Sequence, residues 1–128
     1  MQGRLVMTGL RIVLVEDEPL IALLLEDLLQ AMGHDICATE MTEIDAVAAI
    51  RRTRPDLIIA DSRLRTGSGL RAVATILEER FVPHIFMSGE DLREHVLDPA
   101  AVILKKPFFD PDLVNAIEKA LTSTDTPA

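Results

Sequence analysis

The chain has 128 residues, of which 48% are hydrophobic and only 3% aromatic, and it carries a formal net charge of −8. This length suits one domain with an aliphatic core. The acidic balance and the lack of an extended basic cluster argue against nucleic-acid binding, and no apolar run approaches the roughly 20 residues that a membrane-spanning helix needs. A single cysteine, Cys37, excludes an internal disulfide, so we expect a cytoplasmic protein.

The first strand and helix can be placed from the spacing of apolar residues. β-branched and apolar residues over 11–16 predict a short buried strand. Pro19 suits the first turn of the helix that follows, and Gly33 ends that helix. The expected apolar face of the helix carries leucines spaced four residues apart, Leu20, Leu24 and Leu28, with Ile21, Leu25 and Met32 beside them.

The alternation of strand and helix continues to the end of the chain. Further strands are predicted over 35–39, 56–61, 84–89 and 101–108, and further helices after Thr42, over 70–80 and after Asp110. Between the fourth and fifth strands, residues 91–97 leave room for at most a short helix before Pro99. We therefore expect five strands and five helices, with a shortened fourth helix.

Strands that are apolar throughout are typical of a parallel sheet covered on both faces. Their alternation with helices requires right-handed crossovers. The sequence thus predicts an α/β, doubly wound domain over residues 10–121, with flexible ends at 1–9 and 122–128. About seven residues follow the last helix, so no attached output domain is expected. Such sheets carry their sites at the carboxyl ends of the strands.

Polar side chains follow four of the predicted strands at that edge, namely Glu16, Asp17, Glu18, Asp61, Ser88, Lys105 and Lys106. Crowded carboxylates repel one another and resist burial, and oxygen ligands at this density suit a hard cation such as Mg²⁺. Glu16, Asp17 and Asp61 would share the cation. Lys106 would add a point charge and Ser88 a hydrogen bond. Such a site suits phosphoryl transfer, with a carboxylate as the nucleophile.

The motifs VEDE (15–18), IIADSRL (58–64), FMSG (86–89) and KKPF (105–108) together resemble the receiver domains of two-component response regulators. The resemblance covers nearly the whole chain. It implies a flavodoxin-like sheet of five parallel strands in the order 2-1-3-4-5. It also implies a cis peptide bond before Pro107.

The same resemblance implies a role for each site residue. Asp61 is the phosphoacceptor, Asp17 a direct ligand of Mg²⁺, and Glu16 a ligand through water. The backbone carbonyl of Arg63 completes the protein ligands. Ser88 stands where the family has its switch Thr or Ser, and Lys106 is the family's lysine, whereas Lys105 faces solvent.

Two features depart from the usual family pattern. Most receivers carry an aromatic residue three positions before the lysine, where this chain has Ile103. The segment between Ser88 and Lys106 is also short. Both features resemble a subgroup of often stand-alone receivers with a Phe-Ala-Thr-Gly-Tyr motif, although FMSGE matches that motif only at Phe86 and Gly89. Coupling to a partner is therefore expected to run through Ser88 and residues 89–100.

The resemblance implies a single-domain response regulator, a monomer or weak dimer. A histidine kinase or phosphotransfer protein would phosphorylate it on Asp61 in an Mg²⁺-dependent reaction. It would then signal through an unidentified protein partner or serve as a phosphate sink. No enzymatic activity is expected beyond its own phosphorylation and autodephosphorylation.

Three alternatives stay open at this point. The chain could be a receiver-like adaptor that no longer cycles phosphate. It could be an Mg²⁺-dependent phosphatase with an aspartate nucleophile, although such enzymes normally have an acid where this chain has Arg63. It could also be a flavin-binding module of similar topology, but the acidic loop EDEP (16–19) has the wrong charge for a phosphate.

Overall fold

The computed structural model describes residues 9–122 of the protein. The predicted flexible ends lie outside the described residues, except for Gly9 and Thr122. Both of these are tied into the fold. The amide of Gly9 donates to the carbonyl of Gly33 at 2.9 Å, and Thr122 is the last residue of the final helix.

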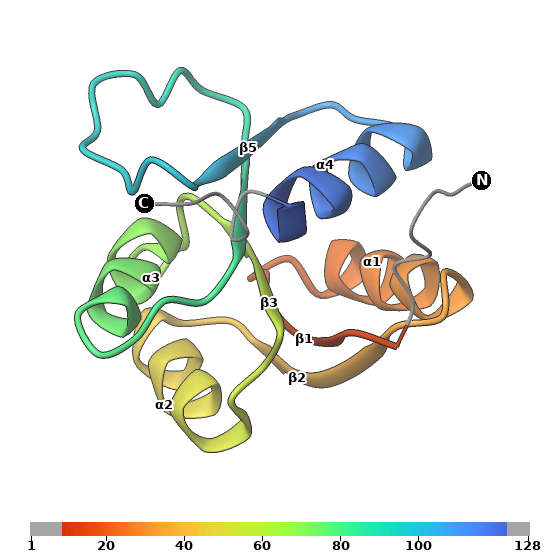
Figure 1. The fold of residues 1–128 in the computed structure, drawn as a ribbon, viewed down its shortest axis with the longest axis horizontal. Coiled ribbons are helices and arrows are strands. Elements are labelled where there is room, and N and C mark those ends of the chain that lie inside the picture. The colour runs from red at the N-terminus through yellow and green to blue at the C-terminus, as the bar shows by residue number, and fades with distance from the viewer. Residues whose placement is uncertain (1–8, 123–128) are drawn as a thin grey trace.

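Five parallel strands form one sheet in the order β2-β1-β3-β4-β5 (Figure 1). The strands are β1 (Arg11–Val15), β2 (Asp35–Glu40), β3 (Leu57–Asp61), β4 (His84–Ser88) and β5 (Val102–Lys105). The helices are α1 (Pro19–Ala31), α2 (Glu43–Thr53), α3 (Gly69–Leu77) and α4 (Asp110–Thr122). The predicted fold class and strand order are confirmed.

The helices cover both faces of the sheet, which explains why the strands are apolar throughout (Figure 1). Along β1, Ile12 and Leu14 point to the face covered by α1 and α4. Val13 and Val15 point to the opposite face, which α2 and α3 cover. No helix in the described part of the chain is long and apolar enough to cross a membrane.

The residues predicted to begin and end the helices lie at the helix ends in the structure. Pro19 opens α1, and the side chain of Thr42 accepts a hydrogen bond from the amide of Asp45 at 3.1 Å. Gly33 follows the end of α1 with a φ of +94°, in the left-handed region that favours glycine. The peptide bond between Lys106 and Pro107 is cis.

The predicted apolar face of α1 was correct for Leu25 and wrong for Leu20 and Leu24. The helix buries Ala22, Leu25 and Leu29, whereas Leu20 and Leu24 are 67% and 58% exposed. Leu28 is only partly buried against the core. The error has a simple physical cause, because α1 carries leucines around most of its circumference and Leu25 and Leu29 are themselves four residues apart.

The connection between β4 and β5 contains no helix, so the structure goes beyond the shortening that we expected. Residues 9–122 form four helices instead of five. Polar side chains in this connection bond to the backbone nearby. Asp91 accepts from the amide of Arg93, and Asp98 accepts from the amide of Ala100. Such local bonds compete with helical hydrogen bonding, and Pro99 limits the length that a helix could reach.

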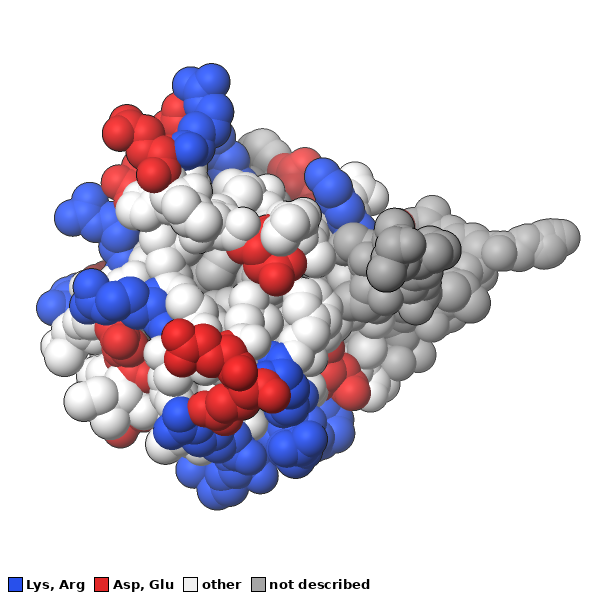
Figure 2. All heavy atoms as spheres, turned by 60° about the vertical axis from the view of Figure 1, so that its left-hand side comes forward, with Lys and Arg blue, Asp and Glu red and all other residues white. Residues whose placement is uncertain are grey.

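The outer surface of the described residues carries both signs of charge. In Figure 2, basic side chains gather along the lower edge of the visible face, with acidic side chains directly beside them. Oppositely charged side chains form several ion pairs among the described residues, such as the one between Arg51 and Glu79.

Candidate functional site at the carboxyl edge of the sheet

The strand ends bring the residues singled out from the sequence together. A cleft of about 460 Å³ at this edge is lined by five of the six, namely Glu16, Asp17, Asp61, Arg63 and Lys106. The sixth, Ser88, lines an adjoining hollow of about 390 Å³ that also contains Asp61, Arg63 and Lys106. Asp61 therefore lies at the junction of the two spaces.

Asp61 is the last residue of β3, and only 4% of its surface is exposed. The Nζ atom of Lys106 lies 2.5 Å from its Oδ1 atom. Lys106 is held in place by its backbone amide, which donates to the carbonyl of Ser88 at 2.8 Å. This buried carboxylate thus has a fixed counter-charge, as an ion removed from water requires.

Glu16 follows β1 directly and is 1% exposed. Its Oε2 atom accepts a hydrogen bond from the amide of Glu18 at 3.0 Å. Its Oε1 atom is buried and has no hydrogen-bond partner among the described residues. Burial, followed by the hydrogen bond and the negative charge of Asp61, raises the pKa of Glu16 to about 8, while Lys106 opposes the shift. The protein without a cation therefore leaves this carboxyl poorly satisfied as an anion.

Carboxylate oxygens of Glu16, Asp17 and Asp61 lie within 4.8 Å of one another. All the donors in this cluster are oxygen atoms, the type that Mg²⁺ prefers. The unpaired Oε1 of Glu16 is the kind of buried polar atom that an ion or its bound water would satisfy. The cluster is thus compatible with Mg²⁺ binding, as predicted from the sequence.

Ser88 ends β4 and is 2% exposed. Its hydroxyl donates to the carbonyl of Glu90 and accepts from the amide of the same residue, both at 3.1 Å. The carboxylate of Glu90 in turn lies 3.4 Å from the guanidinium of Arg63. Ser88 therefore connects the site around Asp61 to the first residues of the connection between β4 and β5.

Gly69 lies directly against Asp61, a contact that the sequence analysis did not predict. A Cβ atom at this position would lie 1.8 Å from the backbone oxygen of Asp61. No side chain fits there without movement of the backbone. The amino end of α3 can approach the end of β3 this closely only because residue 69 is glycine.

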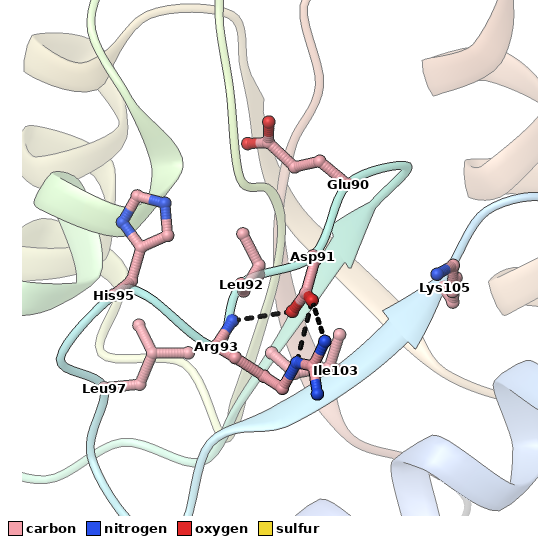
Figure 3. A pocket seen from close by; sticks show the side chains of 8 residues that line it. All are labelled: Glu90, Asp91, Leu92, Arg93, His95, Leu97, Ile103 and Lys105. Carbon is pink, nitrogen blue, oxygen red and sulfur yellow. Dashed lines mark hydrogen bonds and ion pairs between the residues drawn. The ribbon is translucent and has the colours of Figure 1, made fainter.

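A separate groove of about 590 Å³ lies along the connection between β4 and β5 (Figure 3). Ile103 and Lys105 of β5 line one side of it, and Asp91 and Arg93 form an ion pair within it. Ile103 is 43% exposed. Lys105 therefore does not join Lys106 at Asp61, in agreement with the sequence-based expectation.

Comparison with known proteins agrees with this geometry. Residues 12–118 match the family described as response regulator receiver domain. The chain is 38% identical over 114 residues to the phyllosphere-induced regulator PhyR of Methylorubrum extorquens, covering 86% of this chain and 43% of PhyR. It is 33% identical over 116 residues to the transcriptional regulatory protein PdtaR of Mycobacterium tuberculosis, covering 88% of this chain and 57% of PdtaR. The chain thus spans about half the length of these curated relatives.

A solved structure shows the same fold. The receiver (REC) domain of the response regulator PhyR from Erythrobacter litoralis, determined by solution NMR, superposes with a TM-score of 0.80 at 34% identity. The match covers 95% of this chain and 97% of that domain. Together with the family match over residues 12–118, the strand order and the acidic cluster, this shows that the chain belongs to the family of response regulator receiver domains.

Proposed function

We propose that the protein is a phosphorylation switch that accepts a phosphoryl group on Asp61 from a histidine kinase or phosphotransfer protein. One observation carries this proposal: the buried Asp61 carboxylate lies 2.5 Å from the Lys106 ammonium and beside the carboxylates of Glu16 and Asp17. In this arrangement a nucleophile, a fixed cation and a set of oxygen ligands for a metal surround one point, which is what phosphoryl transfer requires.

In the proposed reaction, a carboxylate oxygen of Asp61 attacks the phosphorus of the donor's phosphohistidine. The new O–P bond forms as the P–N bond breaks, and the electron pair of the P–N bond stays with the donor's imidazole. Lys106 offsets the negative charge on the transferred oxygens. Glu16, Asp17 and the carbonyl of Arg63 would hold Mg²⁺. When bound, the ion neutralises charge on the phosphoryl oxygens.

Phosphorylation would reach the surface through Ser88. Its hydroxyl is engaged by both backbone groups of Glu90, yet it also lines the hollow next to Asp61. A phosphoryl group on Asp61 brings strong acceptor oxygens and extra negative charge. Ser88 would then give up Glu90 to bind a phosphoryl oxygen, and the connection between β4 and β5 would lose one of its attachments.

The exposed leucines of α1 give the phosphodonor a place to dock. Leu20 and Leu24 are large apolar side chains in water, and Ile21 of the same helix lines the acidic cleft. An exposed apolar surface next to a reactive site is typical of a protein–protein contact. We infer that a helical surface of the donor covers this face while its phosphohistidine enters the cleft.

The phosphatase alternative finds no support in the geometry. That activity would use a second acid at the place of Arg63, and the Arg63 side chain is instead exposed and paired with Glu90. The alternative of an adaptor that no longer cycles phosphate is separated from our proposal by experiment.

The test is phosphorylation by a small phosphodonor such as acetyl phosphate, followed by intact-protein mass spectrometry. We expect the wild type to gain one phosphoryl group with Mg²⁺, and little or none with EDTA. Asp61→Asn should remain unmodified. Asp56→Asn is a matched control, because Asp56 lies just before the opposite end of the same strand, where its carboxylate accepts from the amide of Arg11. An unmodified wild type would favour the adaptor, and a modified Asp61→Asn would contradict the assignment of Asp61.

A further inference from the structure

The loop that follows β3, residues 62–68, is fastened to α2 at one end. The carboxylate of Glu43 accepts from the amide of Ser68 at 3.0 Å, and the amide of Glu43 donates to the carbonyl of Thr66 at 3.2 Å. Gly67 allows this close approach, because a Cβ atom there would lie 2.5 Å from the Cβ of Glu43. The far end of the loop therefore has a fixed position.

The middle of the same loop is fastened to the acidic residues after β1, and one residue makes both contacts. The backbone amide of Arg65 donates to Oδ2 of Asp17 at 2.6 Å. The guanidinium of Arg65 forms an ion pair with the carboxylate of Glu18. Asp17 and Glu18, which follow β1, are thus both bonded to the loop that follows β3.

The position of Arg65 matters because of its neighbours. Arg63, whose carbonyl would be a metal ligand, lies two residues earlier in the loop and lines the same cleft as Asp17. Joining Asp17 to residue 65 therefore also limits its distance from residue 63. In addition, a ligand carboxylate with one oxygen bound to an amide cannot turn freely, which is how residues that do not touch a metal orient those that do.

We propose that Arg65 is a positioning residue of the cation site, which clasps Asp17 and Glu18 to the loop after β3 and so sets the affinity of the site for Mg²⁺. This inference rests on the proposed function. Arg65 does not touch the cation. Its amide holds the carboxylate of Asp17, and its guanidinium, through Glu18, holds the loop against the residues that follow β1.

A simpler account treats Arg65 as a positive charge that repels a cation. The two accounts predict opposite signs for one substitution. If Arg65 acts only through its charge, Arg65→Gln should strengthen Mg²⁺ binding and Glu18→Gln should weaken it, so that the double variant returns close to wild type. If Arg65 positions Asp17, both single variants should bind Mg²⁺ more weakly than the wild type does. The double variant should then bind Mg²⁺ no more weakly than either single variant.

The experiment is a titration of the full chain with Mg²⁺, followed by backbone amide chemical shifts. We expect Arg65→Gln and Glu18→Gln each to weaken binding by roughly 3–10-fold, and Arg65→Pro, which also lacks the amide hydrogen, by roughly 10–100-fold. Arg65→Lys should recover part of the loss. Arg51→Gln is the matched control, because Arg51 forms a similarly exposed ion pair with Glu79, away from the acidic cleft, and its loss changes the net charge equally.

Thermal unfolding without Mg²⁺ separates positioning from damage to the fold. We expect the midpoint of Arg65→Gln to match that of Arg51→Gln while their affinities for Mg²⁺ differ. Stronger or unchanged binding by Arg65→Gln would overturn the role proposed for Arg65. Asp17→Asn tests the site itself, since Mg²⁺ binding that is absent from the wild type or unaffected by Asp17→Asn would contradict the proposed cation site.

Discussion

Two connections leave the carboxyl edge of the sheet and are built in opposite ways. The loop after β3 bonds to other elements through Glu43, Asp17 and Glu18. The connection between β4 and β5 mostly bonds to itself, as in the pair formed by Asp91 and Arg93. The first loop holds the groups that do chemistry in fixed positions. The second has few long-range attachments and is therefore the segment suited to reorder after a local event.

The apolar contacts show the same difference. In the connection between β4 and β5, Leu92 is buried and Leu97 is partly buried in the core, whereas Val96 is fully exposed. Directly after the loop that follows β3, Gly69 lies so close to the backbone of Asp61 that there is no space for a Cβ atom. The phosphorylation that we propose would need a rigid segment for phosphoryl transfer and a more loosely attached segment for signalling. In this protein these two segments follow adjacent strands, β3 and β4.

The largest effect should come from adding one methyl group to each connection. Gly69→Ala places a Cβ atom 1.8 Å from the carbonyl oxygen of Asp61, whereas a Cβ atom at Gly89 has no atom within 4 Å. We expect Gly69→Ala to lower the free energy of unfolding by about 3 kcal/mol and Gly89→Ala by less than about 0.5 kcal/mol. Urea unfolding of both variants measures this. Equal losses would break the comparison.

The buried carboxyl group of Glu16 should also make the free energy of unfolding depend on pH. The pKa of Glu16 is raised to about 8 in the folded protein, mainly by burial. The unfolded state therefore releases this proton at lower pH than the folded state, so stability is lost as pH rises toward 8.

The measurement is urea unfolding without Mg²⁺ at several pH values from 6.5 to 8. The lower end of this window coincides with the ordinary pKa of histidine, 6.5, and burial lowers the pKa values of His34 and His84. These histidines therefore add a rise in stability near pH 6.5, which the wild type and Glu16→Gln share. We expect the free energy of unfolding of the wild type to fall by roughly 2 kcal/mol from pH 6.5 to 8, and that of Glu16→Gln to fall much less. A wild type and variant with the same slope would show that Glu16 is already ionised.

A smaller effect is expected when one carboxylate is removed from the edge. Asp17 shares a carboxylate cluster with Asp61, so Asp17→Asn should relieve the repulsion between these like charges. Asn can still accept the hydrogen bond from Arg65. Without Mg²⁺, we expect its thermal midpoint to rise by about 2–4 °C, corresponding to roughly 1 kcal/mol. A clearly lower midpoint would mean that Asp17 stabilises the fold even without a metal.

Much of the fold and of the candidate site could be predicted from the sequence, because both depend on periodic patterns. Apolar strands that alternate with helices determine a parallel sheet, and its topology brings all strand ends to one edge. Glu16, Asp61 and Ser88 could therefore be assigned to one site from their positions along the chain. The cap at Thr42 could be predicted for a similar reason, since it depends only on residues within one turn of the helix.

The rest depends on contacts that no local pattern encodes. The buried face of α1 could not be predicted because leucines occur on several sides of that helix. Gly69 lies close to Asp61 because the loop between them turns back on itself. Arg65 lies close to Asp17 because the fold brings together two segments that are distant in the sequence. The missing helix between β4 and β5 reflects competition from Asp91 and Asp98, whose individual hydrogen bonds are too weak to decide the outcome alone.

The most direct test of the whole account is hydrogen exchange at backbone amides with and without beryllofluoride, a mimic of the phosphoryl group, in the presence of Mg²⁺. We expect the largest change in protection across residues 88–100 and little change over 62–68. Ser88→Ala should remove most of that change while Asp61 can still be phosphorylated, and Ile103→Ala should leave its direction intact. A change centred on α1 and α2, or one that survives Ser88→Ala in full, would contradict the account.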